Sequence, residues 1–388
     1  MNSFIPLSIP NFEGNEEEYA LEAVRQGWVS TGGAYITELE HRLEDFLKVP
    51  IIAACQSGTA ALHMALIESG VMPGDSVIVP TLTFIAAVNP VRYQFANPVF
   101  MDCDDSLCMD PEKLLQFCEQ ECRLIEGRLI HKKTKSHIKA LVVVHIFGNL
   151  ADMEKIMDVA ETYHLKVIED ATEALGSYYT EGRYAGRYAG TIGDFGAYSF
   201  NGNKIITTGG GGALTAKKPE DAEHAKYIST QAKDDPLFYI HHEVGYNYRM
   251  TNLQAALGAA QMEELPEFIR RKQHNYEIYQ DLFQNYEKAE LLPFRTGVNS
   301  NKWFYSLMIH PEQTGKAIAE IIAELQNMGV QTRPIWGLIH KQKPYSSFEH
   351  YKIHMAEYYS RRIINIPCST QLKKKDIEYV AETIIKIL

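Results

Sequence analysis

Short apolar runs alternate with amphipathic segments between residues 51 and 199, and this alternation limits the possible folds more than any other feature. Runs rich in Val, Ile and Ala are typical of buried strands, whereas apolar residues at helical spacing indicate helices. The predicted strands are 51–54, 76–79, 98–101, 140–144, 166–168 and 195–199, and the predicted helices between them are 58–69, 84–93, 111–118 and 153–163. The pattern predicts an α/β domain whose mostly parallel sheet has helices on both faces.

The pattern changes near residue 255. Charged helices are predicted at 252–264 and 267–287, and they lead into a smaller α+β region with a strand at 303–309, a helix at 316–328 and a final helix from 375. We therefore predict two domains. Residues 1–255, with two helices near the N-terminus, form the large domain, and residues 256–388 form the small one.

Composition narrows the classes of partner and compartment. The formal net charge of −11 argues against nucleic acid and against an anionic membrane surface. The six cysteines form no CxxC pair, and no Cys or His spacing is typical of a metal site, so we expect reduced thiols, no metal and a cytoplasmic protein. The first residues lack a signal-peptide pattern, and the longest apolar stretch, near 140–147, is too short to span a bilayer.

Three motifs at predicted strand ends carry the groups that a pyridoxal phosphate site needs. Lys204, before a run of four glycines at 209–212, supplies an amine that condenses with an aldehyde. Asp170 supplies an acid that keeps a pyridine nitrogen protonated. The turn at 57–59 supplies helix N-terminal N–H groups for a phosphate. Ligands on parallel sheets gather at the carboxyl ends of the strands, which is where these motifs fall.

Each motif also has a plainer interpretation. Ser57 is a good helix N-cap, Phe84 is a plausible core residue, and a lone His145 at a strand end is more often structural than functional. Phe84 is equally suited to stack on an aromatic ring. The glycine run lacks the Gly-Lys-Ser/Thr ending of a nucleotide-binding P-loop and does not open a helix.

Taken together and in this order, the motifs resemble the DegT/StrS family of nucleotide-sugar aminotransferases, which are fold type I pyridoxal phosphate enzymes. The resemblance extends from the 27–32 segment, GWVSTG, to the TRPIW segment at 332–336 and the INIP segment at 364–367. It implies a large domain around a mixed, mostly parallel sheet, a small C-terminal α+β domain, and a homodimer with active sites at the interface.

The resemblance also implies roles for single residues. Lys204 matches the lysine that bonds the cofactor, Asp170 matches the acid under the pyridine nitrogen, and Glu173 takes a position, often Gln in the family, that contacts the ring hydroxyl. The matches to phosphate and ring contacts are Ser57, Gly58, Thr59, Phe84, Ser199 and Asn247, the last reaching into the neighbouring subunit. Candidate substrate contacts are Trp28, His145, Arg249 and Arg333.

The segments 201–211 and 229–233 resemble a branch that makes 4-amino sugars of the bacillosamine and legionaminic acid type. This branch moves the amino group of L-glutamate to C4 of UDP-2-acetamido-2,6-dideoxy-4-hexulose, for cell-surface glycans such as lipopolysaccharide O-antigen. Three alternatives remain. A sugar dehydratase of this type has His where Lys204 stands, a sensor would bind the cofactor or sugar nucleotide without turnover, and a third enzyme class acts on amino acids alone.

Overall fold

The computed structural model describes residues 4–235 and 237–388, and a ten-stranded sheet lies at its centre. Along the sheet the strands run β1 (Ala53–Cys55), β10 (Gly212–Ala216), β9 (Phe195–Ser199), β7 (Lys166–Asp170), β6 (His137–Val144), β2 (Ser76–Pro80), β3 (Asn97–Met101) and β15 (His350–Tyr351). Neighbours from β9 to β15 are parallel, and only β10 on this path runs antiparallel to both of its neighbours. The α/β class and the mostly parallel sheet are confirmed.

Helices connect these strands where the sequence pattern predicts them. They are α3 (Gly58–Glu68), α4 (Asn89–Tyr93), α5 (Pro111–Glu121) and α6 (Met153–Tyr163). The helix α7 (Pro219–Ser229), which follows β10, is not among the predicted elements. The one helix expected at 84–93 is instead a short 3-10 turn, η1 (Ile85–Ala87), followed by α4. Pro90 has no N–H with which to close a helical bond to residue 86, so the chain breaks there. The hairpin β4 (Cys122–Ile125) and β5 (Arg128–His131) extends the sheet beside β6.

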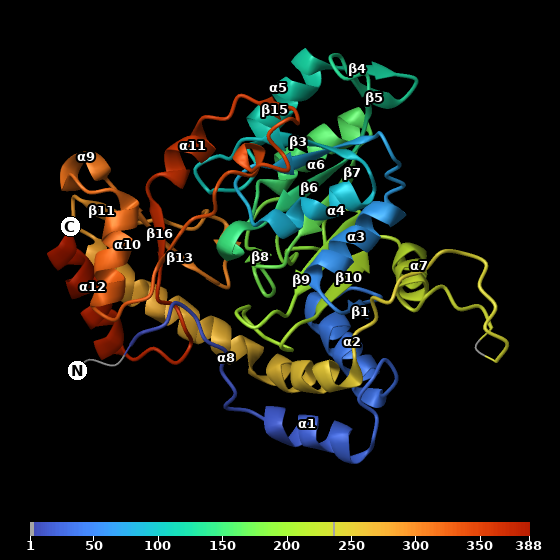
Figure 1. Cartoon of the computed structure of the whole chain (residues 1–388), viewed down its shortest axis with the longest axis horizontal. Helices are drawn as coiled ribbons and strands as arrows, with labels where there is room; N and C mark the ends of the chain where they lie inside the picture. The colour runs from blue at the N-terminus through green and yellow to red at the C-terminus, as the bar shows by residue number, and fades with distance from the viewer. Residues whose placement is uncertain (1–3, 236) are drawn as a thin grey trace.

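A single long helix, α8 (Asn252–Phe283), crosses the molecule beneath the sheet (Figure 1). The two helices predicted at 252–264 and 267–287 are therefore one, with Pro266 inside it. Pro266 cannot donate the usual backbone bond, but the helix continues because Leu265 and Phe268 are buried on either side of it. The helix begins with a capping box between Thr251 and Gln254. It packs on α1 (Glu16–Arg25) and α2 (Ala34–Leu47).

The C-terminal part contains an antiparallel four-stranded sheet in the order β11 (Ala289–Leu291), β13 (Tyr305–Ile309), β16 (Ile363–Ile366) and β14 (Arg333–Pro334). Its main helices are α10 (Ile318–Asn327) and α12 (Lys374–Ile387), with the shorter α9 (Pro311–Thr314), η3 (Ile339–Lys341) and α11 (Met355–Ser360). A separate two-stranded sheet pairs β12 (Val298–Asn299) of the C-terminal part with β8 (Tyr178–Tyr179), which lies between β7 and β9 in the chain.

The two parts interlock. Residue 255, the expected domain boundary, lies in the first turn of α8. Ile5 forms a parallel bridge with Val330, and β15 pairs with β3 of the large sheet although it belongs to the C-terminal half. The division at residue 255 stays a prediction about folding units, because chain segments cross it in both directions.

Within residues 4–235 and 237–388, we find no helix whose length and apolar character would let it traverse a lipid bilayer.

Candidate active site

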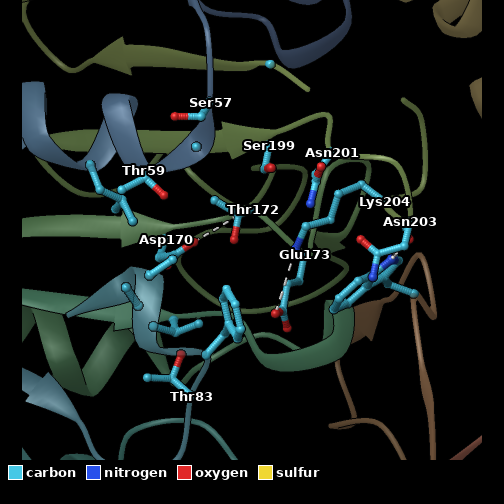
Figure 2. Close-up of a pocket in the computed structure, with 18 of the residues that line it drawn as sticks. Ser57, Thr59, Thr83, Asp170, Thr172, Glu173, Ser199, Asn201, Asn203 and Lys204 are labelled. Atoms are coloured by element: carbon cyan, nitrogen blue, oxygen red, sulfur yellow. Dashed lines mark hydrogen bonds and ion pairs between the residues drawn. The ribbon is translucent and has the colours of Figure 1, made fainter. Parts of the chain in front are cut away.

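A cavity of about 360 Å³ opens at the carboxyl ends of the central strands. Asp170 ends β7, Ser199 ends β9, and Ser57 lies between β1 and α3. The polar groups around the cavity are Ser57, Thr59, Thr83, Asp170, Thr172, Glu173, Ser199, Asn201, Asn203 and Lys204 (Figure 2). Chain topology thus brings together the three motifs that the sequence placed at strand ends.

One end of the cavity is built by the first turn of α3. Ser57 caps this helix, and its Oγ accepts a bond from the N–H of Ala60 at 3.1 Å. A Cβ at Gly58 would lie 2.8 Å from both Ser199 Cβ and Thr172 Cγ2, so only glycine fits without a shift. The first N–H groups of a helix lack intrahelical acceptors and carry partial positive charge. With the Thr59 and Ser199 hydroxyls beside them, they form a site suited to an anion.

Asp170 is a buried carboxylate on the wall of the cavity. Its side chain is 3% exposed, and its Oδ1 accepts a bond from the N–H of Thr172 at 3.1 Å. Burial raises the pKa of Asp170. No Lys, Arg or His among the described residues forms an ion pair with it. A carboxylate in this position has a large desolvation cost that a cationic ligand would offset.

Lys204 and Glu173 face each other inside the same cavity (Figure 2). Lys204 Nζ lies 3.8 Å from Glu173 Oε1, and Glu173 Oε2 accepts a bond from the N–H of Phe147 at 2.8 Å. Burial raises the pKa of Glu173 to about 7, although the nearby Lys204 opposes the shift. Burial lowers the pKa of Lys204, although Glu173 and Asp170 oppose it. Both shifts favour the uncharged forms of the two side chains.

Phe84 also lines the cavity, with 54% of its side chain exposed. Of the residues predicted to hold the cofactor, the structure therefore brings Ser57, Gly58, Thr59, Phe84, Asp170, Glu173, Ser199 and Lys204 to one cavity. Asn247 is not among the residues lining it. Asn247 is exposed, and its side-chain oxygen accepts a bond from Gln231 at 3.1 Å.

The four candidate substrate contacts lie away from this cavity. His145 is fully buried, with Nε2 at 2.9 Å from Glu169 and Nδ1 at 3.3 Å from the N–H of Ala151. Since Nδ1 accepts from a backbone N–H, Nε2 carries the proton that it donates to Glu169, and both nitrogens serve the fold. Arg249 pairs with the buried carboxylate of Glu40.

Trp28 and Arg333, the other two candidates, are exposed. Trp28 is 59% exposed, and its backbone oxygen accepts a bond from Asn252 at 2.6 Å. Arg333 lies on β14, and its side chain donates to the backbone oxygen of the neighbouring Thr332 at 3.1 Å. Neither side chain lines the cavity of its own chain.

Sequence reasoning missed the aromatic wall of the cavity, which Trp303, Phe304 and Trp336 supply. The ring of Trp303 lies 4.0 Å from Lys204 Nζ. The sequence pattern predicted a strand at 303–309 in the small C-terminal domain. The observed strand, β13, begins at Tyr305, so Trp303 and Phe304 lie just before it. A pair of large aromatics directly before a strand was the available signal.

The chain matches known proteins along almost its whole length. The model of the DegT/DnrJ/EryC1/StrS aminotransferase family matches residues 10–385, which confirms the resemblance. The chain is 34% identical to the GDP-perosamine synthase of Escherichia coli O157:H7 over 386 residues, covering 98% of each chain. It is 30% identical to the spore coat polysaccharide biosynthesis protein SpsC of Bacillus subtilis over 404 residues, covering 100% of this chain and 98% of SpsC. A crystal structure of a DegT DnrJ EryC1 StrS aminotransferase from Brucella abortus superposes with a TM-score of 0.85 at 25% identity, covering 95% of this chain and 94% of that one.

Proposed function

We propose a function from one premise: the chain belongs to the DegT/DnrJ/EryC1/StrS aminotransferase family. It is a pyridoxal phosphate-dependent sugar aminotransferase that acts on a nucleotide sugar. The reaction we propose moves the amino group of L-glutamate to C4 of a 4-keto-6-deoxy sugar, UDP-2-acetamido-2,6-dideoxy-4-hexulose. The product is a 4-amino sugar for a cell-surface glycan.

The carboxylate of Asp170, which has no ion-pair partner among the described residues, is the structural observation that supports the cofactor chemistry of this proposal. It is buried, it lines the cavity, and the described residues give it no ion-pair partner. A protonated pyridine nitrogen is a cation that would pair with this carboxylate, so the residues fit pyridoxal phosphate. Lys204 would bond its aldehyde, Asp170 would hold its ring nitrogen, and the first turn of α3 with Ser199 would hold its phosphate. When bound, the cofactor supplies an electron-accepting ring that makes protons on the adjacent carbon removable.

The protein's own share of the chemistry is to position groups and move protons. Burial lowers the pKa of Lys204, which favours the neutral amine, and a neutral Nζ can accept a proton and return it within the cavity. The N–H of Phe147 donates to the carboxyl group of Glu173 and fixes its position. Because the pKa of Glu173 is about 7, this carboxyl group is partly protonated near pH 7. Trp303, Phe304 and Trp336 exclude water from one wall.

The sugar and the amino donor are inferred from the segments at 201–211 and 229–233, which resemble the branch that uses glutamate and UDP-linked 4-keto sugars. A relative with 34% identity is named a GDP-perosamine synthase, so the nucleotide is the part of the proposal that most needs a direct test. Trp28 and Arg333 stay candidate substrate contacts because both are exposed. The cytoplasmic location also stays a prediction.

We further propose that the working form is a homodimer. Asn247 is exposed and lies outside the cavity of its own chain, although it was expected to reach a phosphate. The preceding segment carries large exposed apolar side chains, with Leu237 at 73%, Phe238 at 71% and Val244 at 85% exposure. In Figure 1 this segment, drawn in yellow, projects from α7 away from the body of the chain. In the dimer we propose, a second copy covers these residues, and Asn247 lies at the cavity of that second copy.

The test is a pair of half-reactions on purified protein loaded with pyridoxal phosphate. Glutamate should convert the bound cofactor to pyridoxamine phosphate, seen as loss of the visible absorption band. A UDP-linked 4-keto-6-deoxy sugar should restore the band, whereas its GDP- and TDP-linked counterparts should restore it at least tenfold more slowly.

A Lys204→Ala variant is the matched control, and it should show neither the visible band of the lysine-bound cofactor nor turnover. Restoration only by the GDP-linked sugar would overturn the proposed nucleotide. Restoration by 2-oxo acids but by no keto sugar would overturn the proposed substrate class.

A further inference from the structure

The indole ring of Trp303, from the C-terminal half of the chain, packs against the side-chain amine of Lys204. The ring lies 4.0 Å from Nζ, while the carboxylate of Glu173 lies 3.8 Å from the same nitrogen. Lys204 comes from the loop that follows β9, whereas Trp303 comes from the segment between β12 and β13. The amine is therefore held by one residue from each half of the chain.

The indole is itself fixed at several points. Its Nε1 donates to the backbone oxygen of Asn203 at 2.7 Å, so it is tied to the residue directly before Lys204. Its backbone N–H donates to the side-chain oxygen of Asn301 at 3.0 Å. The ring stacks on Phe304 with centroids 4.0 Å apart, and 3% of Trp303 is exposed. A side chain bonded and stacked in this way has little freedom to leave the amine.

A buried lysine anchors the same segment to α8. Lys272 Nζ donates to the backbone oxygens of Trp303 at 2.6 Å and Cys368 at 2.7 Å. Burial lowers the pKa of Lys272, and its partners here are carbonyl oxygens. Because α8 spans both halves of the molecule, this contact fixes the position of Trp303 relative to the large sheet.

We propose that Trp303 is a positioning residue that holds the Lys204 amine toward the cavity whenever the amine is not bonded to the cofactor. This role rests on the proposed function, in which the amine is released and bonded again during each cycle. The four-carbon stem of a free lysine samples many rotamers, so an amine already held near its target bonds faster. An aromatic face within about 6 Å attracts an ammonium group, and the same contact keeps the neutral amine out of bulk water.

The experiment separates formation of the lysine bond from binding of the cofactor. Cofactor-free protein is mixed with pyridoxal phosphate, and the rate constant for appearance of the visible band is measured. The dissociation constant for pyridoxamine phosphate, which forms no lysine bond, is measured on the same preparations. For Trp303→Leu we expect the rate constant to fall roughly tenfold, while the dissociation constant for pyridoxamine phosphate rises less than about threefold.

Two further variants keep the result interpretable. Trp303→Phe retains an aromatic face and should recover a rate constant within about threefold of the unaltered protein. Trp303→Met lacks the face and gives the same test if the leucine variant does not fold. Trp336→Leu is the matched control, because it removes another indole from the same cavity, one that packs on Phe147. In this variant the rate constant for bond formation should fall by no more than the affinity for pyridoxamine phosphate falls.

The outcomes are distinct. If the unaltered protein forms no visible band, the proposed function fails. If it forms the band and the Trp303→Leu or Trp303→Met variant forms it equally fast, the role of Trp303 is overturned. Equal losses in bond formation and in pyridoxamine phosphate affinity would likewise overturn it, because they indicate a general defect of the cavity.

Discussion

At the residue scale, Glu173 is a buried carboxyl group whose charge state changes near neutral pH. Its carboxyl is 4% exposed and accepts one backbone bond, from Phe147. Burial raises its pKa from 4.5 to about 7. Glutamine, common at this position in the resembling family, keeps the shape and cannot ionise. Glutamate therefore adds a pH dependence that a glutamine at the same place would lack.

For Glu173→Gln, we expect cofactor-free protein to gain stability relative to the unaltered chain as pH rises. Between pH 4.5 and about 7 the folded protein keeps a proton that the unfolded chain has lost, so the free energy of unfolding falls as pH rises through this window. The glutamine variant has no such loss. Its advantage from this loss should be about 1 kcal/mol or less at pH 5 and larger by roughly 1–3 kcal/mol at pH 8.

Urea unfolding midpoints at pH 5, 6, 7 and 8 measure this difference. Glu17→Gln, which removes an exposed carboxylate on α1, is the control and should shift the midpoint little at any pH. An advantage of the same size at pH 5 and pH 8 would contradict the raised pKa.

At the scale of elements, the first turn of α3 packs against the carboxyl ends of two strands, β9 and β7. Gly58 opens this helix and lies against Ser199 at the end of β9 and Thr172 after β7. The close approach of these side chains to the helix leaves the helical N–H groups facing the cavity. The spacing between α3 and the two strand ends thus sets the size of the proposed phosphate site.

Gly58→Ala should weaken binding of pyridoxamine phosphate at least tenfold. The added methyl would lie 2.8 Å from Ser199 Cβ and Thr172 Cγ2, closer than Cβ atoms come in real proteins, so the helix must shift. Gly202→Ala is the matched control, since a Cβ there meets nothing within 4 Å. The measurement is equilibrium binding followed by fluorescence, and equal affinities for the two variants would show that the spacing of α3 is not limiting.

The elements also show which parts of the site a sequence can predict. Asp170, Ser57 and Lys204 were predictable because Asp170 ends a buried strand and the other two follow one. Parallel strands bring their carboxyl ends to one edge of a sheet. Trp303 was not predictable, because its contact with Lys204 depends on how the two halves of the chain pack, and no local pattern records that. The continuity of α8 through Pro266 was missed for the same reason, since burial of its neighbours outweighs the lost backbone bond.

At the scale of the whole molecule, one chain supplies most of a site but leaves an exposed segment and an exposed Asn247 beside it. Asn247 lies in the segment that passes the end of β1, where Gln56 N–H donates to the Tyr248 oxygen at 2.7 Å. Asn247 is therefore close in space to the Ser57 turn, although it is distant in sequence, and it does not line the cavity. Asn247 was expected to contact a phosphate but lies outside the cavity of its own chain, which is consistent with a role in the cavity of a second copy.

This arrangement predicts complementation between two defective variants. Lys204→Ala cannot bond the cofactor, and Asn247→Ala should weaken cofactor binding roughly tenfold through loss of a hydrogen bond to a charged group. In a heterodimer of the two, one cavity carries both defects. The other combines the intact lysine of one chain with the intact asparagine of its partner.

Co-expression with two different affinity tags allows this heterodimer to be purified. We expect half of its cavities to bind pyridoxal phosphate with the affinity of the unaltered protein and to show the visible band. If Asn247 instead serves its own chain, every cavity in the heterodimer is defective and none reaches that affinity. A heterodimer that cannot be isolated because the chains are monomeric would exclude a shared site altogether, since the residue that completes each cavity would then have no second chain to come from.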